Sequence, residues 1–338
     1  MKIGNREIGP GRAYIIADVG SNFKGSLSLA KEYIDAGASI GLDAVKFQTY
    51  RAETLLNRFT PDGEPWAAYD VVGRCELPLE WHEQLFEYAQ AAGVEFMTTP
   101  FDLEVVDLLV RIGVRAFKVA SGDLTFTLLL KKLASTGKPV ILSTGAAYLH
   151  EVGGALTTLK EGGADVALLH CVSNYPPKYE QVNLRAIETM IKVFDVPVGL
   201  SDHTPDTVTA LGAVALGASI IEKHITMDKN LGTPDAPFAM TVDEFGRMAT
   251  DIRRLEAAMG GGIKAPAADE IGERAWARRG VFAVRTLEAG KELTAEDVKF
   301  VRPAVGLSAS DWPAVMGKRL GKAVEKDSPL LREQIDGY

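Results

Sequence analysis

The sequence predicts a (β/α)8 barrel followed by a small β-rich module, and three observations lead to this fold class. Short apolar runs rich in β-branched residues recur along the first two thirds of the chain. Segments with apolar residues at helical spacing separate these runs, and many of them end in glycine. The last part of the chain has neither pattern and shows short strand-like pieces between turn signals. Alternation of strands and helices is typical of a parallel sheet with helices outside it.

Eight runs are predicted strands, and they begin at Ala13, Ala44, Glu95, Ala116, Pro139, Val166, Val196 and Ala218. The predicted helices cover residues 28–39, 80–93, 103–113, 126–137, 183–194, 207–217 and 240–259. The main competing fold is a doubly wound sheet. No GxGxxG motif follows any of the strands, and eight units over roughly 250 residues match a barrel. The sequence therefore favours the barrel.

The segment GGGIKAPAADE predicts a boundary near residue 262, because glycine, proline and alanine dominate it. The expected domains are a barrel over 1–262, a linker over 263–278 and a compact β module over 279–338. A module of about 60 residues is marginally stable alone, so we expect it to pack on a barrel or on a partner subunit.

Composition narrows the class of protein. Hydrophobic residues make up 46% and charged residues 24%, as in a folded globular protein. The net charge of −8 argues against general attraction to nucleic acid or to an anionic membrane. Two cysteines without a CxxC pair, no signal-peptide pattern and no membrane-length apolar run together favour a cytoplasmic protein.

Polar side chains gather at the ends of the predicted strands, where barrels place their chemistry. Lys46 and Lys118 each interrupt an apolar strand. With the hydroxyls of Thr99, Ser121, Ser143 and Ser201 they form a candidate phosphate site. The alternative is that each lysine pairs with a neighbouring acid or extends to solvent.

Two histidines follow adjacent strands. His203 and His224 can converge on one divalent metal, with water and ligand oxygens completing the coordination shell. Either histidine alone would more often be structural. Asp18 and Asp123 are candidates for the metal shell or for activating water, against the alternative of solvated loop aspartates.

The strand-end motifs together resemble the sialic acid synthase family. In chain order they are IIADVGSNFKG, DAVKFQTY, FKVASGD, ILSTG, HCVSNYP, GLSDHT and EKHITMDKNLGTPDAPF, followed by RPAVGLS in the tail. The resemblance covers almost the whole chain, and the tail resembles the family's antifreeze-like (SAF) domain. It implies a homodimer in which this domain closes over the neighbouring barrel.

The resemblance also implies a reaction and the residues that carry it. Phosphoenolpyruvate would condense with an N-acetylated amino sugar aldehyde to give a nonulosonic acid and phosphate. A divalent metal, usually Mn²⁺ with Mg²⁺ or Co²⁺ as alternatives, would sit on His203 and His224. Phosphoenolpyruvate would be held by Lys46, Thr99, Lys118, Ser121, Ser143, Asn174 and Ser201, and the sugar by Gln48, Tyr175, Asp235 and Arg302.

Five positions depart from the family pattern. Asp18 and Asp123 stand where glutamate is usual, and Phe23, Ala236 and Ala239 replace polar residues. These changes put the usual sugar, N-acetylmannosamine, in question more than phosphoenolpyruvate. Two alternatives follow: a legionaminic or pseudaminic acid synthase acting on a dideoxy-diamino sugar, and a catalytically silent binding protein.

Overall fold

A computed structural model describes residues 1–338, which form two compact units, Met1–Gly260 and Gly261–Tyr338. Eight parallel strands build the first unit. They are β3 (Tyr14–Asp18), β4 (Ala44–Thr49), β5 (Glu95–Pro100), β6 (Phe117–Val119), β7 (Val140–Ser143), β8 (Val166–Cys171), β9 (Val198–Asp202) and β10 (Ile220–Thr226). Hydrogen bonds join them in the order β5-β4-β3-β10-β9-β8-β7-β6, and β5 packs beside β6. The sheet thus nearly closes, which confirms the predicted barrel.

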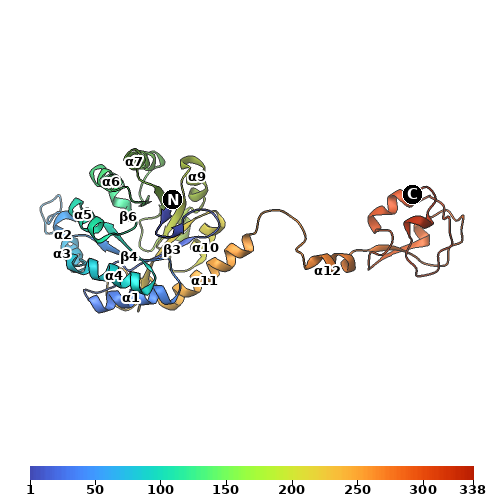
Figure 1. Cartoon of the computed structure of the whole chain (residues 1–338), viewed down its shortest axis with the longest axis horizontal. Coiled ribbons are helices and arrows are strands. Elements are labelled where there is room, and N and C mark those ends of the chain that lie inside the picture. The colour runs from blue at the N-terminus through green and yellow to red at the C-terminus, as the bar shows by residue number, and fades with distance from the viewer. The chain divides into compact units, whose positions relative to one another are not determined.

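One principal helix follows each strand and covers the outside of the barrel (Figure 1). These helices are α1 (Leu27–Ser39), α4 (His82–Ala92), α5 (Leu103–Ile112), α6 (Thr127–Ala134), α7 (Leu149–Glu161), α9 (Arg185–Phe194), α10 (Val208–Ala215) and α11 (Val242–Met259). Shorter helices lie in the loops: α2 (Ala52–Leu55), α3 (Ala67–Gly73) and α8 (Tyr179–Val182). No helix combines the length and apolarity needed to cross a membrane.

Local sequence signals set several helix ends. The Asp102 side chain accepts a hydrogen bond from Val105 N and starts α5, while Thr241 and Glu244 form a capping box at the start of α11. Gly93 and Gly113 end α4 and α5 with positive φ angles of 80° and 96°. At a positive φ angle glycine is less strained than other residues, because it has no Cβ.

Helix α7 is absent from the sequence-based expectations. Two adjacent glycines, Gly153 and Gly154, lie inside it and lower its intrinsic helical preference. The helix forms because it buries Val152, Leu156 and Leu159 against the barrel. Packing therefore outweighs local preference here.

The interior of the barrel is apolar at one end and polar at the other. Near the N-terminal ends of the strands, a cluster including Tyr14, Ile16, Met97, Ile141 and Ile220 fills it. A short hairpin of β1 (Lys2–Ile3) and β2 (Arg6–Glu7), not predicted from the sequence, contributes Ile3 to this cluster. The apolar plug leaves the C-terminal ends of the strands for polar side chains.

The second unit has its own small core. Strands β12 (Gly280–Ala283) and β13 (Val298–Val301) pair antiparallel, and short α13 (Trp312–Val315) packs with them through Trp312 and Val315. The predicted linker 263–278 differs from expectation because it contains a helix, α12 (Glu270–Ala277). Acidic residues in its first turn and alanines favour helix there. Trp276 on this helix is 70% exposed.

Candidate active site

Strand alternation sorts the polar residues into inward and outward sets. Since side chains of a strand alternate between its faces, residues two positions beyond an interior apolar residue also point inwards. Asp18 lies two residues after Ile16, and Lys46 lies two residues after Ala44. Glu222 and His224 lie two and four residues after Ile220. The register agrees, because Asp18 pairs with both Lys46 and His224 across neighbouring strands. The same rule places Asp202 and Lys223 on the outer side.

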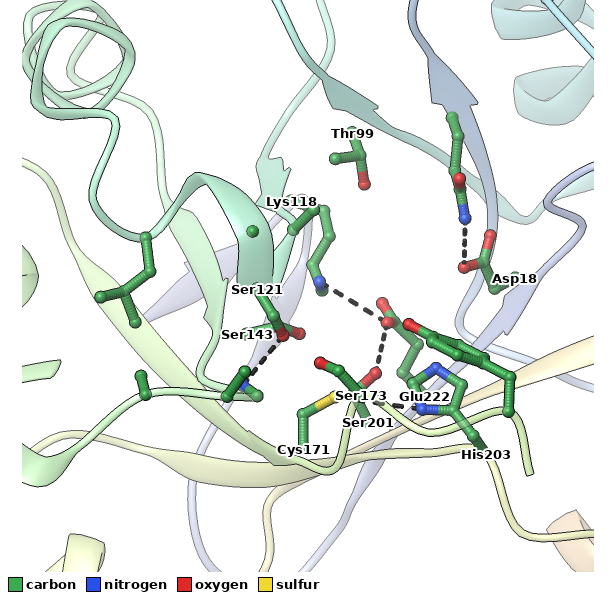
Figure 2. Close-up of a pocket in the computed structure, with 18 of the residues that line it drawn as sticks. Asp18, Thr99, Lys118, Ser121, Ser143, Cys171, Ser173, Ser201, His203 and Glu222 are labelled. Carbon is green, nitrogen blue, oxygen red and sulfur yellow. Dashed lines mark hydrogen bonds and ion pairs between the residues drawn. The ribbon is translucent and has the colours of Figure 1, made fainter. Parts of the chain in front are cut away.

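The inward side chains line a cavity of about 550 Å³ at the C-terminal end of the barrel. It is walled by most of the predicted site residues: Asp18, Lys46, Gln48, Thr99, Lys118, Ser121, Ser143, Tyr175, Ser201, His203 and His224. Figure 2 shows several of them converging from different strands on one space. The structure thus brings together the two lysines, four hydroxyls and both histidines that the sequence predicts for one site.

Asp18 lies in a cluster of donors. Its Oδ2 accepts hydrogen bonds from Lys46 Nζ at 2.7 Å and Gln48 Nε2 at 3.0 Å, and it lies 3.6 Å from His224 Nε2. Burial favours the neutral acid, but Lys46 and His224 outweigh it and hold the pKa of Asp18 well below its usual range. Asp18 is therefore an anion that orients its neighbours, and it is a weak base.

A second buried carboxylate, Glu222, lies between the two lysines. Its oxygens are 3.6 Å from Lys46 Nζ and 3.6 Å from Lys118 Nζ, and Oε1 accepts a hydrogen bond from Ser201 Oγ at 3.0 Å. Figure 2 marks the contacts of Glu222 with Lys118 and Ser201. Burial lowers the pKa of Lys118 despite the opposing effect of Glu222. In Lys46 the carboxylates of Asp18 and Glu222 overcome burial and raise the pKa.

Unpartnered polar atoms concentrate around this cavity. Five of the six buried side-chain atoms without a hydrogen-bond partner belong to residues at this end of the barrel: Thr99, Asp123, Ser143, Glu222 and His224. The sixth belongs to Asp43, which forms an ion pair with Arg6 at 2.7 Å. Buried polar groups normally have partners. A polar ligand in the cavity would supply partners for the four that line it, Thr99, Ser143, Glu222 and His224.

The two predicted metal-binding histidines are neighbours. Their ring centres are 5.4 Å apart. Nδ1 of His203 donates to the carbonyl of Val172 at 3.2 Å, which leaves Nε2 as an acceptor. Burial, with a contribution from His224, lowers the pKa of His203 to about 4, so this imidazole is neutral at neutral pH. His224 Nδ1 is buried without a partner.

A second cavity of about 520 Å³ shares Gln48, Tyr175 and His224 with the first. Its remaining wall is mainly apolar and consists of Pro176, Pro205, Pro234, Asp235, Pro237 and Phe238. Tyr175 lies over His203, with ring centres 4.2 Å apart. Asp235 is fixed by Ser21, whose backbone N and side-chain hydroxyl both donate to its Oδ2 at 2.7 Å.

Two predicted site residues of the barrel, Asp123 and Asn174, lie outside both cavities, and a third, Arg302, belongs to the second unit. Asp123 ends a short turn, Ser121–Asp123, beside the first cavity and does not line it. Asn174 is exposed, and its amide donates to Gln181 at 3.3 Å. Arg302 is exposed in the second unit, directly after β13.

Phe23, Ala236 and Ala239 line neither cavity. From the sequence, these three replacements were expected to put the usual sugar in question. Phe23 is 1% exposed and packs edge-on against Trp81, and Ala236 and Ala239 are 0% and 1% exposed. These three side chains themselves therefore offer no polar group to either cavity.

Glu222 and Cys171 are two chemically reactive residues of the first cavity to which the sequence analysis assigned no role. Glu222 is an acid in an otherwise apolar strand, and its place two residues after Ile220 and two before His224 is the signal that identifies it as inward. Cys171 lines the cavity 4.0 Å from His203 Nδ1. Burial raises the pKa of its thiol, so it is protonated and a poor nucleophile at neutral pH.

Asp123→Asn is expected to change the pH dependence of stability. Burial raises the pKa of Asp123 from 3.8 to about 6, although Lys118 opposes the shift. Because the pKa is raised in the folded state, the contribution of Asp123 to stability is fully present below pH 3.8 and is lost as the pH rises through about 6. Asparagine has no charge to bury, so it removes this loss. After a discount for the partial exposure of the side chain, the free energy of unfolding at pH 7 is expected to rise by about 1 kcal/mol. Urea unfolding at pH 4 and pH 7 measures the difference; an identical pH dependence in both proteins would contradict the burial of this carboxylate.

Comparison with known proteins identifies the family to which this site belongs. Residues 33–264 match the NeuB family, and residues 278–336 match the SAF domain. The chain belongs to the NeuB family. It is 39% identical to the N,N'-diacetyllegionaminic acid synthase of Legionella pneumophila, over 96% of this chain and 94% of that protein. It is 33% identical to the pseudaminic acid synthase of Helicobacter pylori, over 95% of this chain and 97% of that protein.

A solved structure supports the same assignment. The N-acetylneuraminic acid (sialic acid) synthetase of Leptospira borgpetersenii, in complex with citrate, superposes with a TM-score of 0.75 and 36% identity. The match covers 81% of this chain and 94% of that chain. The predicted resemblance to sialic acid synthases, the barrel with its SAF domain and the prediction of a transferase of this type are therefore confirmed.

Proposed function

We propose that this NeuB-family enzyme condenses phosphoenolpyruvate with an N-acetylated amino sugar aldehyde, giving a nonulosonic acid and phosphate. The observation that carries the proposal is the first cavity, where two buried lysines stand among hydroxyls without partners. Lys46 and Lys118 are each 2% exposed, and Thr99 and Ser143 have unpartnered oxygens. A ligand with a phosphate and a carboxylate would meet both lysines and give both hydroxyls an acceptor.

The reaction forms one carbon–carbon bond, adds the oxygen of water to C2 and breaks the bond between C2 and the phosphate oxygen. C3 of phosphoenolpyruvate attacks the aldehyde carbon, whose oxygen takes a proton and becomes a hydroxyl. Water adds to the cationic C2 and loses one proton, which balances the proton taken by the aldehyde oxygen. The resulting tetrahedral centre expels phosphate, which carries away the remaining hydroxyl proton and leaves a ketone at C2. Lys46 and Lys118 hold the anionic half of the substrate, and Asp18 keeps Lys46 and Gln48 oriented.

A divalent metal fits His203 and His224. One imidazole is neutral with a free Nε2, and the other has an unpartnered buried nitrogen. No group of three or more His, Cys, Asp and Glu side chains is arranged to hold an ion, so the two histidines would leave positions for water and substrate oxygens. When bound, Mn²⁺, or Mg²⁺ or Co²⁺ in its place, supplies Lewis-acid polarisation of the aldehyde carbonyl.

The second cavity is the proposed acceptor site, with Gln48, Tyr175 and Asp235 available for the sugar. Its four prolines and Phe238 favour a second candidate acceptor, a dideoxy-diamino sugar. The methyl group and second N-acetyl group of such a sugar would bury apolar surface where a hydroxymethyl group would lose hydrogen bonds to water. The enzyme would then be a legionaminic or pseudaminic acid synthase, as the names of two relatives suggest.

The family resemblance also supports a homodimer in which the SAF unit supplies Arg302 to the acceptor site of the partner. Sedimentation of the purified full chain tests the dimer. A mass of one chain at micromolar concentration would contradict it.

Phosphate release tests the proposed reaction. Phosphoenolpyruvate and Mn²⁺ are incubated with the enzyme and a panel of N-acetylated hexosamines and dideoxy-diamino sugars, with a chelator control. We expect release that requires an acceptor, stops with chelator and is fastest for a dideoxy-diamino sugar. Equal or faster release with N-acetylmannosamine would refute the second candidate. Phosphoenolpyruvate binding without release from any acceptor would favour a silent binding protein.

A further inference from the structure

A buried ion pair lies directly behind the two histidines, on the outer side of the barrel wall. Lys223 Nζ is 2.7 Å from Asp202 Oδ2, and the two residues are partners in the register of β10 and β9. Asp202 is 3% exposed and Lys223 is 2% exposed. Neither residue lines the first or the second cavity. The pair is thus separate from the groups expected to touch substrate.

The hydrogen bonds of this pair fix the turn that carries His203. Asp202 Oδ1 accepts from Thr204 N at 2.9 Å, and its Oδ2 accepts from the hydroxyls of Thr204 at 3.1 Å and Thr209 at 2.6 Å. Lys223 Nζ donates to the Thr204 carbonyl at 2.6 Å. The residues on both sides of His203 are therefore fixed by directional bonds.

The same pair links the two strands that carry the imidazoles. His203 follows Asp202 and His224 follows Lys223, so each charged residue points outwards beside a histidine that lines the cavity. Thr209 adds a contact from helix α10, outside the barrel. A shift of Asp202 relative to Lys223 would move one imidazole relative to the other.

The energetics of such a pair favour a role beyond holding the fold. Removing two charges from water is costly, and an apolar pair of similar volume often stabilises a core as well or better. An apolar pair, however, has no donors or acceptors to fix Thr204. The ion pair therefore provides a defined geometry for the turn, which apolar packing would leave less constrained.

We propose that Asp202 and Lys223 are positioning residues that set the spacing of His203 and His224 and thereby the affinity of the metal site. The inference rests on the proposed function, because it takes these histidines to be the metal ligands. The partners of metal-binding residues commonly change metal affinity 10- to 100-fold when they are altered.

The test measures the dissociation constant of Mn²⁺ for the full-length enzyme without substrates. The electron paramagnetic resonance signal of the free ion reports how much Mn²⁺ remains unbound. Asp202→Asn and Lys223→Met are each expected to raise the Mn²⁺ dissociation constant at least about 10-fold. Thr209→Val is a nearly isosteric change that removes one donor to Asp202, and it is expected to raise the Mn²⁺ dissociation constant by a smaller factor. If the other two variants do not fold, this variant alone tests the positioning role. Thermal unfolding without metal is recorded for every variant.

Asp43→Asn is the matched control. Asp43 is also a buried carboxylate with arginine partners, Arg6 and Arg253, but it lies at the opposite end of the barrel. It is expected to lower thermal stability and leave the Mn²⁺ dissociation constant unchanged. An equal loss of Mn²⁺ affinity in this control would overturn the inference, since any weakening of the fold would then be sufficient.

The inference and the proposed metal site fail in different ways. If the unaltered enzyme binds no Mn²⁺, or binds it equally after His203→Ala, the metal site itself is refuted. If the unaltered enzyme binds Mn²⁺ through His203 but Asp202→Asn, Lys223→Met and Thr209→Val bind it equally well, the positioning role is refuted and the proposed function stands.

Discussion

Turnover in the presence of Mn²⁺ is expected to fall at least about 1,000-fold in His203→Ala, a loss of about 4 kcal/mol of transition-state stabilisation. The reason is that His203 offers a neutral imidazole whose other nitrogen is fixed by the Val172 carbonyl, and only His224 would remain as a histidine ligand. The fold should persist, because the side chain lies at the cavity end of the barrel and outside the apolar clusters. Initial rates at saturating substrates, with circular dichroism as a check on folding, give the result.

The control for this variant is His150→Ala, which removes an exposed histidine that stacks on Tyr148 and lines neither cavity. Its rate should match that of the unaltered enzyme. A folded His203→Ala protein that keeps full Mn²⁺-dependent activity would contradict the assignment of the metal site.

The second large effect is expected from Lys118→Met, which should lower kcat/KM for phosphoenolpyruvate about 100- to 1,000-fold, or about 3 to 4 kcal/mol. The KM for the acceptor sugar should change little, because Lys118 lines only the first cavity. The variant removes a buried cation from the cavity proposed to hold the phosphate and carboxylate of phosphoenolpyruvate. It also leaves Glu222 with a single lysine partner, Lys46.

A double variant separates these two consequences. Lys118→Met with Glu222→Gln removes the carboxylate that lost a partner, so thermal stability should recover while phosphoenolpyruvate binding remains weak. Lys132→Met is the surface control, because Lys132 pairs only with Asp107 outside the cavity. Recovery of phosphoenolpyruvate binding in the double variant would show that Lys118 serves to neutralise Glu222 rather than to hold substrate.

The strands and most of the cavity were predictable because both depend on short-range patterns. Apolar runs marked the strands, and the polar residues that ended them, such as Lys46 and His224, marked the C-terminal face. Alternation along each strand carries further information. It separates inward Glu222 from outward Lys223, and applying it to β10 would have assigned Glu222 to the cavity.

The remaining features depend on loops and on packing, which local patterns do not specify. Asp123 and Asn174 follow strand ends in the sequence, yet a tight turn and a hydrogen bond to Gln181 keep them out of the cavities. Phe23 and Ala236 occupy motif positions but are buried in the core. Helix α7 contains two glycines and forms through the apolar residues it buries. In each case tertiary contacts decide the outcome.

The mass of the product tests the central claim most directly. Enzyme, Mn²⁺, phosphoenolpyruvate and the acceptor that releases phosphate fastest are incubated together, and the mixture is analysed by mass spectrometry. The proposed reaction predicts one new compound, the acceptor extended by the three carbons of pyruvate, in an amount equal to the phosphate released. Phosphate accompanied by free pyruvate and unchanged acceptor would contradict carbon–carbon bond formation at this site.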